Sequence, residues 1–221
     1  MLYDWPPSPF CRKVRAVLDR KGLPYERLPA LQHVREIRRR GGIGKVPALS
    51  IDGEMLVDST EIVHTLEERV PAPPVLPREP ELRARCHVLE DWCDEALYFL
   101  GLYHHWRDPA GRRQTRRYFE KTLLGRFAFW PFQAKISAQL DGQGVGRKTA
   151  EHVRRDLDRS LDAVEVMLAT SDYLLPEGPW LCDYALAAQL EYLTRAPATR
   201  GVLDARPSSA AFVARLTTTS R

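Results

Sequence analysis

The residues best placed to do chemistry form the run Ser8-Pro9-Phe10-Cys11 near the N-terminus. Serine is a favoured N-cap and proline is favoured at the first helical position, so this run predicts the start of a helix. The free N–H groups and positive dipole end of such a start favour an anion, and a serine hydroxyl there can donate to a thiolate. The alternative is structural: Ser8 caps the helix, and Cys11 is a small buried hydrophobic residue.

The energy needed for thiolate chemistry at this position is modest. A free thiol has a pKa of about 8.5 and is only a few per cent ionised at neutral pH. Lowering that pKa by about two units takes about 2.7 kcal/mol. One hydrogen bond to the charged sulfur, together with the helix dipole, is enough to supply this.

Two further short motifs suggest binding of a peptide-like ligand. In Gly44–Leu49, read GKVPAL, a proline opens a strand after Val46, which predicts a cis bond before Pro47. That turn would leave the backbone N–H and C=O of Val46 free to pair with a ligand. The structural alternative is that Pro47 is simply a proline on an edge strand.

The other motif is Asp58-Ser59-Thr60-Glu61, which matches a capping box at a helix start. In structural terms it only caps the helix. In functional terms, the hydroxyl and N–H of Ser59 would hold a carboxylate, while Asp58 would hold an ammonium group.

The elements that position these motifs follow from periodicity and turn residues. The sequence predicts the order β-α-β, then α, then β-β-α, with an Asp52-Gly53 turn in the hairpin. The predicted elements are strands at 2–4, 25–28, 47–51 and 54–57 and helices at 9–21, 33–40 and 58–69.

A proline-rich stretch divides the chain. Residues 71–80 read PAPPVLPREP, which predicts a stiff linker between a domain at 1–70 and an all-helical domain at 81–221. Helical periodicity covers 81–107, 112–140, 149–169 and 183–193, with breaks expected at Gly125 and Pro131. The last of these helices is apolar nearly all round, which predicts a buried helix.

Composition narrows the class of protein. The 221 residues are 44% hydrophobic and 28% charged, and the mean hydropathy of −0.37 argues against a disordered or membrane-spanning chain. Because the N-terminus lacks a signal pattern, we expect a cytoplasmic protein.

A net charge of +4 is too small to imply a nucleic-acid partner, and the basic run Arg112, Arg113, Arg116 and Arg117 is interpreted as a solvated helix face. We expect neither a nucleic-acid nor a membrane partner.

The four cysteines, Cys11, Cys86, Cys93 and Cys182, are widely spread and include no CxxC pair. We therefore expect no disulfide framework and no metal site.

Taken together, the order and spacing of these motifs resemble the cytosolic glutathione transferases, in particular a bacterial branch of serine type. The resemblance rests on the S-x-x-C helix start, GKVPAL, the DSTEI helix start, the proline-rich linker and the run Leu181–Ala187, read LCDYALA. It implies a thioredoxin-like α+β domain followed by an all-α domain, and a detoxifying transferase that uses glutathione as co-substrate without a metal. Members of this family are usually homodimers, so we expect a homodimer here.

The resemblance also implies roles for individual residues. Val46, next to a cis Pro47, would pair with the cysteinyl part of glutathione, and Asp58 and Ser59 would hold its γ-glutamyl end. Ser8 falls at the position of the hydroxyl that stabilises the thiolate. Lys45 or Arg12 would meet the glycyl carboxylate.

An acceptor pocket is implied between the two domains. Trp5 and Phe10 would line it from the first domain, and Tyr103, Trp106 and Arg107 from the second.

Two departures from the family pattern stand out. Cys11 follows Ser8 by three residues and would form a mixed disulfide with glutathione if its thiol were exposed and acidified. Trp180 stands where the buried helix usually has a serine or threonine three residues before Asp183, so the usual capping box is absent.

Three functions therefore remain open. The leading one is transfer of glutathione to an electrophilic, mainly apolar small molecule. The second is glutathione-dependent thiol–disulfide or peroxide reduction through Cys11. The third is a non-catalytic scaffold or ligand-binding protein with the same fold.

Overall fold

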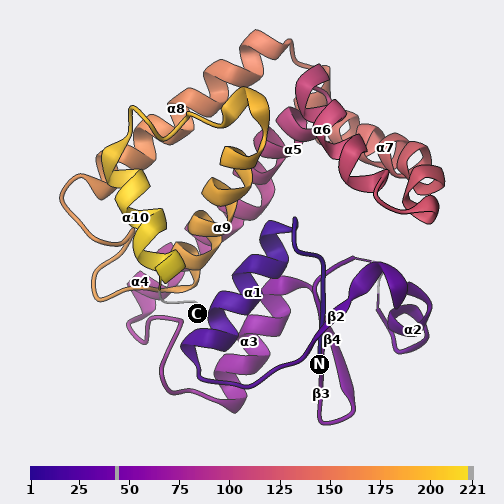
Figure 1. The fold of residues 1–221 in the computed structure, drawn as a ribbon. Helices are drawn as coiled ribbons and strands as arrows, with labels where there is room; N and C mark the ends of the chain where they lie inside the picture. Colours follow the sequence, from indigo (N-terminus) through magenta and orange to yellow (C-terminus); the bar gives the residue numbers. More distant parts are fainter. Residues whose placement is uncertain (43–44, 219–221) are drawn as a thin grey trace. The chain divides into compact units, whose positions relative to one another are not determined.

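The computed structural model describes residues 1–42 and 45–218 (Figure 1). Its N-terminal part is a small sheet with helices, in the order predicted. The elements are β1 (Leu2–Asp4), α1 (Pro9–Arg20), β2 (Arg27–Pro29), η1 (Ala30–Gln32), α2 (Val34–Arg39), β3 (Ala48–Ile51), β4 (Glu54–Val57) and α3 (Ser59–Arg69).

The four strands form one mixed sheet in the order β2-β1-β3-β4. Strand β1 runs parallel to β2 and antiparallel to β3, and β3 and β4 form the predicted hairpin around Asp52-Gly53. This is the expected thioredoxin-like arrangement. Strand β2 begins later than predicted, because the parallel ladder pairs Leu2 with Arg27 and leaves Tyr25 outside it.

Helices α1 and α3 lie side by side (Figure 1) and contact each other through their apolar faces. Val14 and Val17 of α1 and Ile62 and Leu66 of α3 are fully buried. Helix α2 packs on the face of the sheet from which Tyr3 projects, where Ile37 joins the core. The spacing of apolar residues in each helix therefore buries one stripe against the sheet or a neighbouring helix.

A buried lysine ties the proline-rich linker to this domain. The ammonium group of Lys21 donates to Glu67 Oε2 and to the backbone carbonyl of Val70, both at 2.6 Å, and to that of Pro73 at 3.2 Å. The N–H of Val75 donates to the same Glu67 carboxylate. Because Lys21 is 6% exposed, these bonds satisfy an ammonium that would otherwise be costly to bury.

The remainder of the described chain is helical, as predicted. Its elements are α4 (Pro80–Asp91), the π-helical segment η2 (Trp92–Leu97), α5 (Tyr98–Trp106), α6 (Pro109–Phe119), α7 (Leu123–Gln143), η3 (Val145–Arg147), α8 (Ala150–Leu168), α9 (Leu181–Arg195), η4 (Pro197–Thr199) and α10 (Pro207–Thr218).

The breaks predicted at Gly125 and Pro131 are wrong, because both residues lie inside α7. The chain breaks instead before Thr122, whose side chain caps α7 by accepting from the N–H of Gly125 at 3.0 Å. A Cβ at position 125 would lie 2.1 Å from the carbonyl oxygen of Phe119. The glycine therefore permits a close helix–helix turn at this point.

The described chain packs as two units whose boundaries differ from the predicted domains. One unit contains residues 1–90, 172–188 and those from Phe212 onward, and the other contains 91–171 and 189–211. Helix α4 belongs with the sheet because Glu90 pairs with Lys13 of α1. The start of α9 also belongs there, because the N–H of Leu181 donates to the carbonyl of Val75 at 2.7 Å.

Asp183 replaces the missing capping box of the buried helix α9. Its carboxylate is fully buried and accepts from the N–H of Trp180 at 2.7 Å and from the N–H of Leu174 at 2.8 Å. One oxygen thus caps the helix start, and the other holds the loop before it. Burial raises the pKa of Asp183 to about 6, against the opposing effect of these two bonds.

Helix α10 also receives its cap from a distant residue. Glu165 of α8 accepts from the N–H groups of Ser208 and Ser209 at 2.9 and 2.8 Å. Burial alone would raise the pKa of Glu165, but the bonds from these two serines outweigh it and lower the pKa to about 2. The carboxylate is therefore more stable in the folded chain than in the unfolded one.

Replacing Glu165 with glutamine is expected to lower the free energy of unfolding at neutral pH by about 1–2 kcal/mol, the usual cost of a lost helix cap. A lowered folded-state pKa gives stability that is present above pH about 4.5 and is lost as pH falls toward about 2. The wild type should therefore lose more stability across this window than Glu165→Gln. Urea unfolding at several pH values measures both effects, with the exposed Glu151→Gln as the matched control on α8. Parallel pH profiles for wild type and Glu165→Gln would contradict the assignment.

Candidate functional site

The three sequence motifs meet at one edge of the sheet. Strand β1 is antiparallel to β3, with Tyr3 opposite Ala48, and β3 is antiparallel to β4, with Ala48 opposite Val57. The end of β1, the start of β3 and the end of β4 therefore share an edge. Ser8, Val46 and Asp58 each follow or precede one of these strand ends, and α1 and α3 begin there.

Ser8 is the N-cap of α1, as predicted. Its backbone is extended, with φ −74° and ψ 125°, and its Oγ accepts from the N–H of Cys11 at 3.3 Å. The residue is 6% exposed and is followed by Pro9 at the first helical position. The hydroxyl therefore lies at the positive end of a 12-residue helix, where a neighbouring thiolate would be stabilised.

Cys11 is not placed for nucleophilic chemistry. It is fully buried, and its sulfur accepts from the N–H of Trp5 at 3.4 Å. Burial raises the pKa of the Cys11 thiol to about 12, although hydrogen bonds from Trp5 and Ser8 oppose the shift. The exposed, acidified thiol on which the mixed disulfide depended is thus not found, and the thiol stays neutral near pH 7.

The peptide bond between Val46 and Pro47 is cis, as predicted. Val46 is half-buried and precedes β3, whereas Pro47 is buried. Lys45 is exposed, so its charge is accessible at this edge. Gly44, the first residue of the GKVPAL motif, lies outside the described residues.

Asp58 caps α3 in a strained backbone conformation. Its φ is +73°, which is unusual for a residue other than glycine, and its carboxylate accepts from the N–H of Thr60 at 3.0 Å. The side chain of Asp58 is exposed, and Ser59 beside it is 4% exposed. The turn therefore presents a carboxylate next to the N–H groups and hydroxyl of a helix start.

A buried acidic residue that we did not single out as part of the site supports this edge. Asp4, at the end of β1, is 3% exposed and forms ion pairs with Arg15 of α1 at 2.5 Å and Arg27 of β2 at 2.6 Å. Asp4 therefore ties the middle of α1 to strands β1 and β2. The sequence signal was an acidic residue ending an apolar strand, which needs a partner when buried.

The residues predicted to line an acceptor pocket are placed as follows. In the first unit, Trp5 and Phe10 are half-buried near Ser8 in the chain; Arg12, predicted instead to meet the glycyl carboxylate of glutathione, is half-buried on α1. In the second unit, Tyr103 is half-buried, with its ring 5.6 Å from that of His104. The expectation for Trp106 needs correction.

Trp106 is 4% exposed and packs against Phe119, Phe129 and Phe132, with ring centroids 5.3–6.1 Å apart. It is a core residue of its unit, because an aromatic ring at helical spacing buries most of its area against neighbouring rings. Arg107 forms an ion pair with Asp141 within the same unit.

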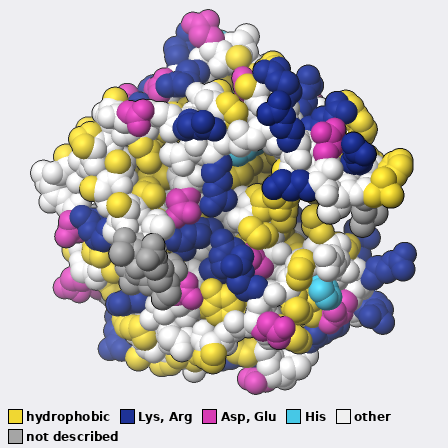
Figure 2. All heavy atoms as spheres, in the orientation of Figure 1, with side chains coloured by type: hydrophobic (Ala, Val, Ile, Leu, Met, Phe, Trp, Pro, Cys, Tyr) yellow, Lys and Arg dark blue, Asp and Glu magenta, His cyan; other side chains and the backbone are white. Residues whose placement is uncertain are grey.

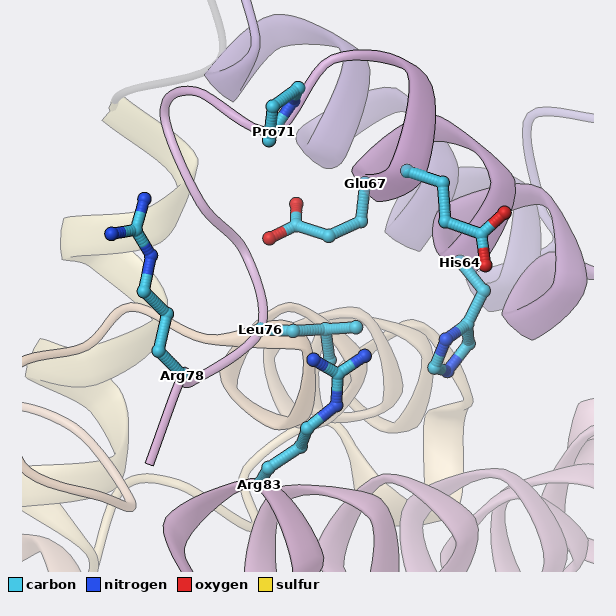
Figure 3. Close-up of a pocket in the computed structure, with 7 residues that line it drawn as sticks. His64, Glu67, Pro71, Leu76, Arg78 and Arg83 are labelled. Carbon is cyan, nitrogen blue, oxygen red and sulfur yellow. The ribbon is translucent and has the colours of Figure 1, made fainter. Parts of the chain in front are cut away.

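A separate cavity of about 300 Å³ lies where α3, the linker and α4 meet (Figure 3). Figure 3 shows Glu67 of α3 and Arg83 of α4 pointing into it, with Leu76 of the linker between them. The cavity adjoins the last turns of α3, whereas Asp58 and Ser59 stand at its first turn. It is therefore distinct from the site at the sheet edge. Among the described residues, no group of three His, Cys, Asp or Glu side chains is placed to hold a metal ion.

Comparisons with known proteins show what this chain is similar to. Residues 2–74 match the family model described as the N-terminal domain of glutathione S-transferase. A probable maleylacetoacetate isomerase of Drosophila melanogaster is 36% identical over 92 residues, which are 38% of this chain and 40% of the relative. The maleylacetoacetate isomerase of Pseudomonas aeruginosa is 39% identical over 92 residues, covering 38% of this chain and 43% of the relative. The matches thus span about two fifths of these curated relatives.

Solved structures extend the likeness over the whole chain. A beta-etherase of Sphingobium aligns with a TM-score of 0.73 at 25% identity, covering 97% of this chain and 93% of the other. A glutathione S-transferase of Methylobacterium radiotolerans, in complex with glutathione sulfonate, aligns with a TM-score of 0.67 at 24% identity, covering 97% and 88%. Residues 2–74 therefore form a domain of the glutathione S-transferase N-terminal type, and the chain shares its fold along nearly its full length with these solved structures.

Proposed function

We propose that this protein is a glutathione-dependent transferase that activates the thiol of glutathione for attack on an electrophilic, mainly apolar small molecule. One observation carries the proposal. Ser8, the cis Val46–Pro47 bond and the Asp58-Ser59 helix start stand at one edge of a sheet, in a domain of the glutathione S-transferase type.

Each part of glutathione has a matching group at this edge. The cysteinyl backbone pairs with the N–H and C=O of Val46, as an added strand pairs with a sheet edge. The γ-glutamyl carboxylate takes the N–H and hydroxyl of Ser59 at the start of α3, and its ammonium faces the exposed carboxylate of Asp58. Lys45 or Arg12 is the cation assigned to the glycyl carboxylate.

Activation of the thiol then falls to Ser8. The hydroxyl donates a hydrogen bond to the sulfur of glutathione, and the N-terminus of α1 adds its positive dipole. Both interactions are stronger with the thiolate than with the thiol, so they lower the thiol pKa. The thiolate attacks the electrophile directly, and no covalent enzyme intermediate forms.

A second candidate function uses the same glutathione thiolate and differs in the acceptor molecule that the thiolate attacks. Curated relatives matched over about two fifths of this chain are named maleylacetoacetate isomerases, which favours an isomerase that uses glutathione. Addition of the thiolate to a conjugated double bond, rotation and release would return glutathione unchanged. Trp5 and Phe10, half-buried beside Ser8 in the chain, favour an acceptor with apolar surface. We also expect a two-fold dimer, as is usual in this family.

Calorimetric titration with reduced glutathione tests the proposal. We expect saturable binding of one equivalent per chain. Asp58→Asn should weaken it about tenfold, because asparagine keeps the cap and tolerates positive φ but removes the charge that faces the ammonium. Asp52→Asn is the matched control, since Asp52 also has positive φ but lies in the exposed β3–β4 turn. Absence of binding up to millimolar glutathione would favour the non-catalytic scaffold instead.

The reductase alternative through Cys11 has its own test. Because Cys11 is fully buried and burial raises its pKa to about 12, Cys11→Ala is expected to keep transferase turnover within about threefold of the wild type. The small loss reflects repacking of a buried side chain. Turnover and thiol–disulfide exchange with glutathione disulfide are measured on both proteins, and Cys86→Ala is the control for removal of a buried thiol. A Cys11→Ala protein that loses all activity while keeping its fold would restore the reductase.

A further inference from the structure

The strongest feature outside the site is a row of exposed apolar side chains on α7. Leu123, Phe127 and Trp130 follow one another at spacings of four and three residues, so they share one helix face. They are 71%, 74% and 59% exposed. Single exposed apolar residues are ordinary on a protein surface, but a contiguous row of this size indicates a contact surface. We call these three residues the α7 ridge.

Basic residues surround the α7 ridge. Residues 109–135 contain seven lysines and arginines and one acidic residue, a net charge of +6, whereas the rest of the chain together carries −2. The one acidic residue, Glu120, forms an ion pair with Arg116 at 2.8 Å. The guanidinium of Arg116 also lies 5.5 Å from the ring centroid of Trp130. In Figure 2, dark blue and yellow side chains lie together over α6 and α7, at the upper right of the view.

We infer that the α7 ridge and the basic residues around it form a docking surface for an anionic lipid bilayer. Leucine, phenylalanine and tryptophan on one helix face, flanked by lysine and arginine, are the side chains that enter the boundary between headgroups and acyl chains. The basic residues add attraction to anionic headgroups. A duplex of nucleic acid would meet the charge but would offer no apolar layer for Leu123 and Phe127.

No helix within residues 1–42 and 45–218 meets the length and apolarity that a membrane crossing requires. The inferred contact departs from our sequence-based expectation of no membrane partner, and from the interpretation of Arg112 and Arg113 as merely solvated. The difference arises because the sequence indicates where the charged residues lie, but it does not indicate that the side chains of the α7 ridge are exposed. The inference is independent of the proposed glutathione chemistry.

Co-sedimentation of the full chain with vesicles tests it. We expect at least about tenfold more protein bound to vesicles of phosphatidylglycerol and phosphatidylcholine than to phosphatidylcholine alone, with the difference removed by high salt. The double variant Leu123→Ser/Phe127→Ser should lose most of this binding, and Arg112→Gln/Arg113→Gln should reduce it by about tenfold. Val166→Ser/Met167→Ser on α8 is the matched control, because those side chains are 75% and 40% exposed outside the basic segment.

All these substitutions are at exposed positions, and circular dichroism verifies the fold of each variant. A change in vesicle binding can therefore be assigned to the substituted surface. Equal binding to both vesicle types, no binding to either, or unchanged binding by Leu123→Ser/Phe127→Ser would overturn the inference. So would a dimer in sedimentation that the same variant converts to monomer, because the ridge would then be an interface between copies of the chain.

Discussion

Replacing Ser8 with alanine is expected to reduce glutathione-dependent turnover by about 100-fold. This is the usual effect of removing one hydrogen-bond donor that stabilises a negatively charged group in an active site. The affinity for glutathione should change by less than about threefold. In the proposed complex Val46 and Asp58 provide most of the contacts that hold the ligand, and one hydrogen bond contributes little net affinity. The effect should therefore fall on kcat and on the ionisation of bound glutathione.

The pH dependence distinguishes this role from a structural one. In the proposed role, Ser8 favours the charged form of the glutathione thiol and so lowers its pKa, and loss of Ser8 should move the pH profile of turnover toward higher pH. The turnover deficit should shrink as pH rises, because the thiolate then forms without assistance. A purely structural defect would lower turnover at every pH by a similar factor.

Two variants control for the loss of the helix cap. Ser8→Thr keeps both the hydroxyl and the cap and should keep most of the turnover. Ser8→Gly removes the hydroxyl but costs the helix only a few tenths of a kcal/mol, so it should be as inactive as Ser8→Ala and more stable. Tyr3 cannot take over the role, since it is fully buried and donates to Glu36 at 2.6 Å. If Ser8→Ala turns over normally, Ser8 is a cap and nothing more.

The local structure of the candidate site was predictable because each of its parts is a local motif. The N-cap at Ser8, the cis bond before Pro47 and the cap at Asp58 depend on residues within three or four positions of one another. The Asp52-Gly53 turn likewise sets the hairpin that places β3 beside β4. Sheet pairing then brings these local signals to a common edge, although Ser8 is about 40 residues from Pro47 and about 50 from Asp58 in the sequence.

Features that depend on distant partners were not predictable in the same way. A lysine in the sequence indicates a solvated position, yet Lys21 is buried because the linker folds back over it. Glu165 caps a helix that begins 42 residues later, and the helix itself was not predicted. The reversal at Trp106 has the same origin, since the aromatic neighbours that bury it come from α6 and α7.

Replacing Lys13 with methionine is expected to lower the free energy of unfolding by about 3–5 kcal/mol, the range for removing one partner of a buried ion pair. Lys13 of α1 is 1% exposed, and its ammonium lies 2.6 Å from Glu90 Oε1 of α4. The hydroxyl of Thr60, on α3, donates to the same oxygen at 2.6 Å. In Lys13→Met the charge of Glu90 stays buried and loses its nearest cation, which is why the single variant is costly.

The cost should come from the buried Glu90 charge that has lost Lys13, and not from the loss of a favourable pair, and a double-mutant cycle separates the two contributions. Lys13→Met/Glu90→Gln should be more stable than Lys13→Met, because an amide is far cheaper to bury than a carboxylate. The exposed pair between Arg85 and Glu81 on the same helix α4 is the matched control, and Arg85→Met should change stability by less than about 0.5 kcal/mol. Urea unfolding measures the wild type, the single variants Lys13→Met and Glu90→Gln, the double variant and Arg85→Met. If Lys13→Met costs no more than Arg85→Met, the contact between α1 and α4 does not depend on the pair. If it costs several kcal/mol and the second substitution recovers part of them, this contact between residues 77 positions apart is a main tie between α4 and the helix that carries Ser8.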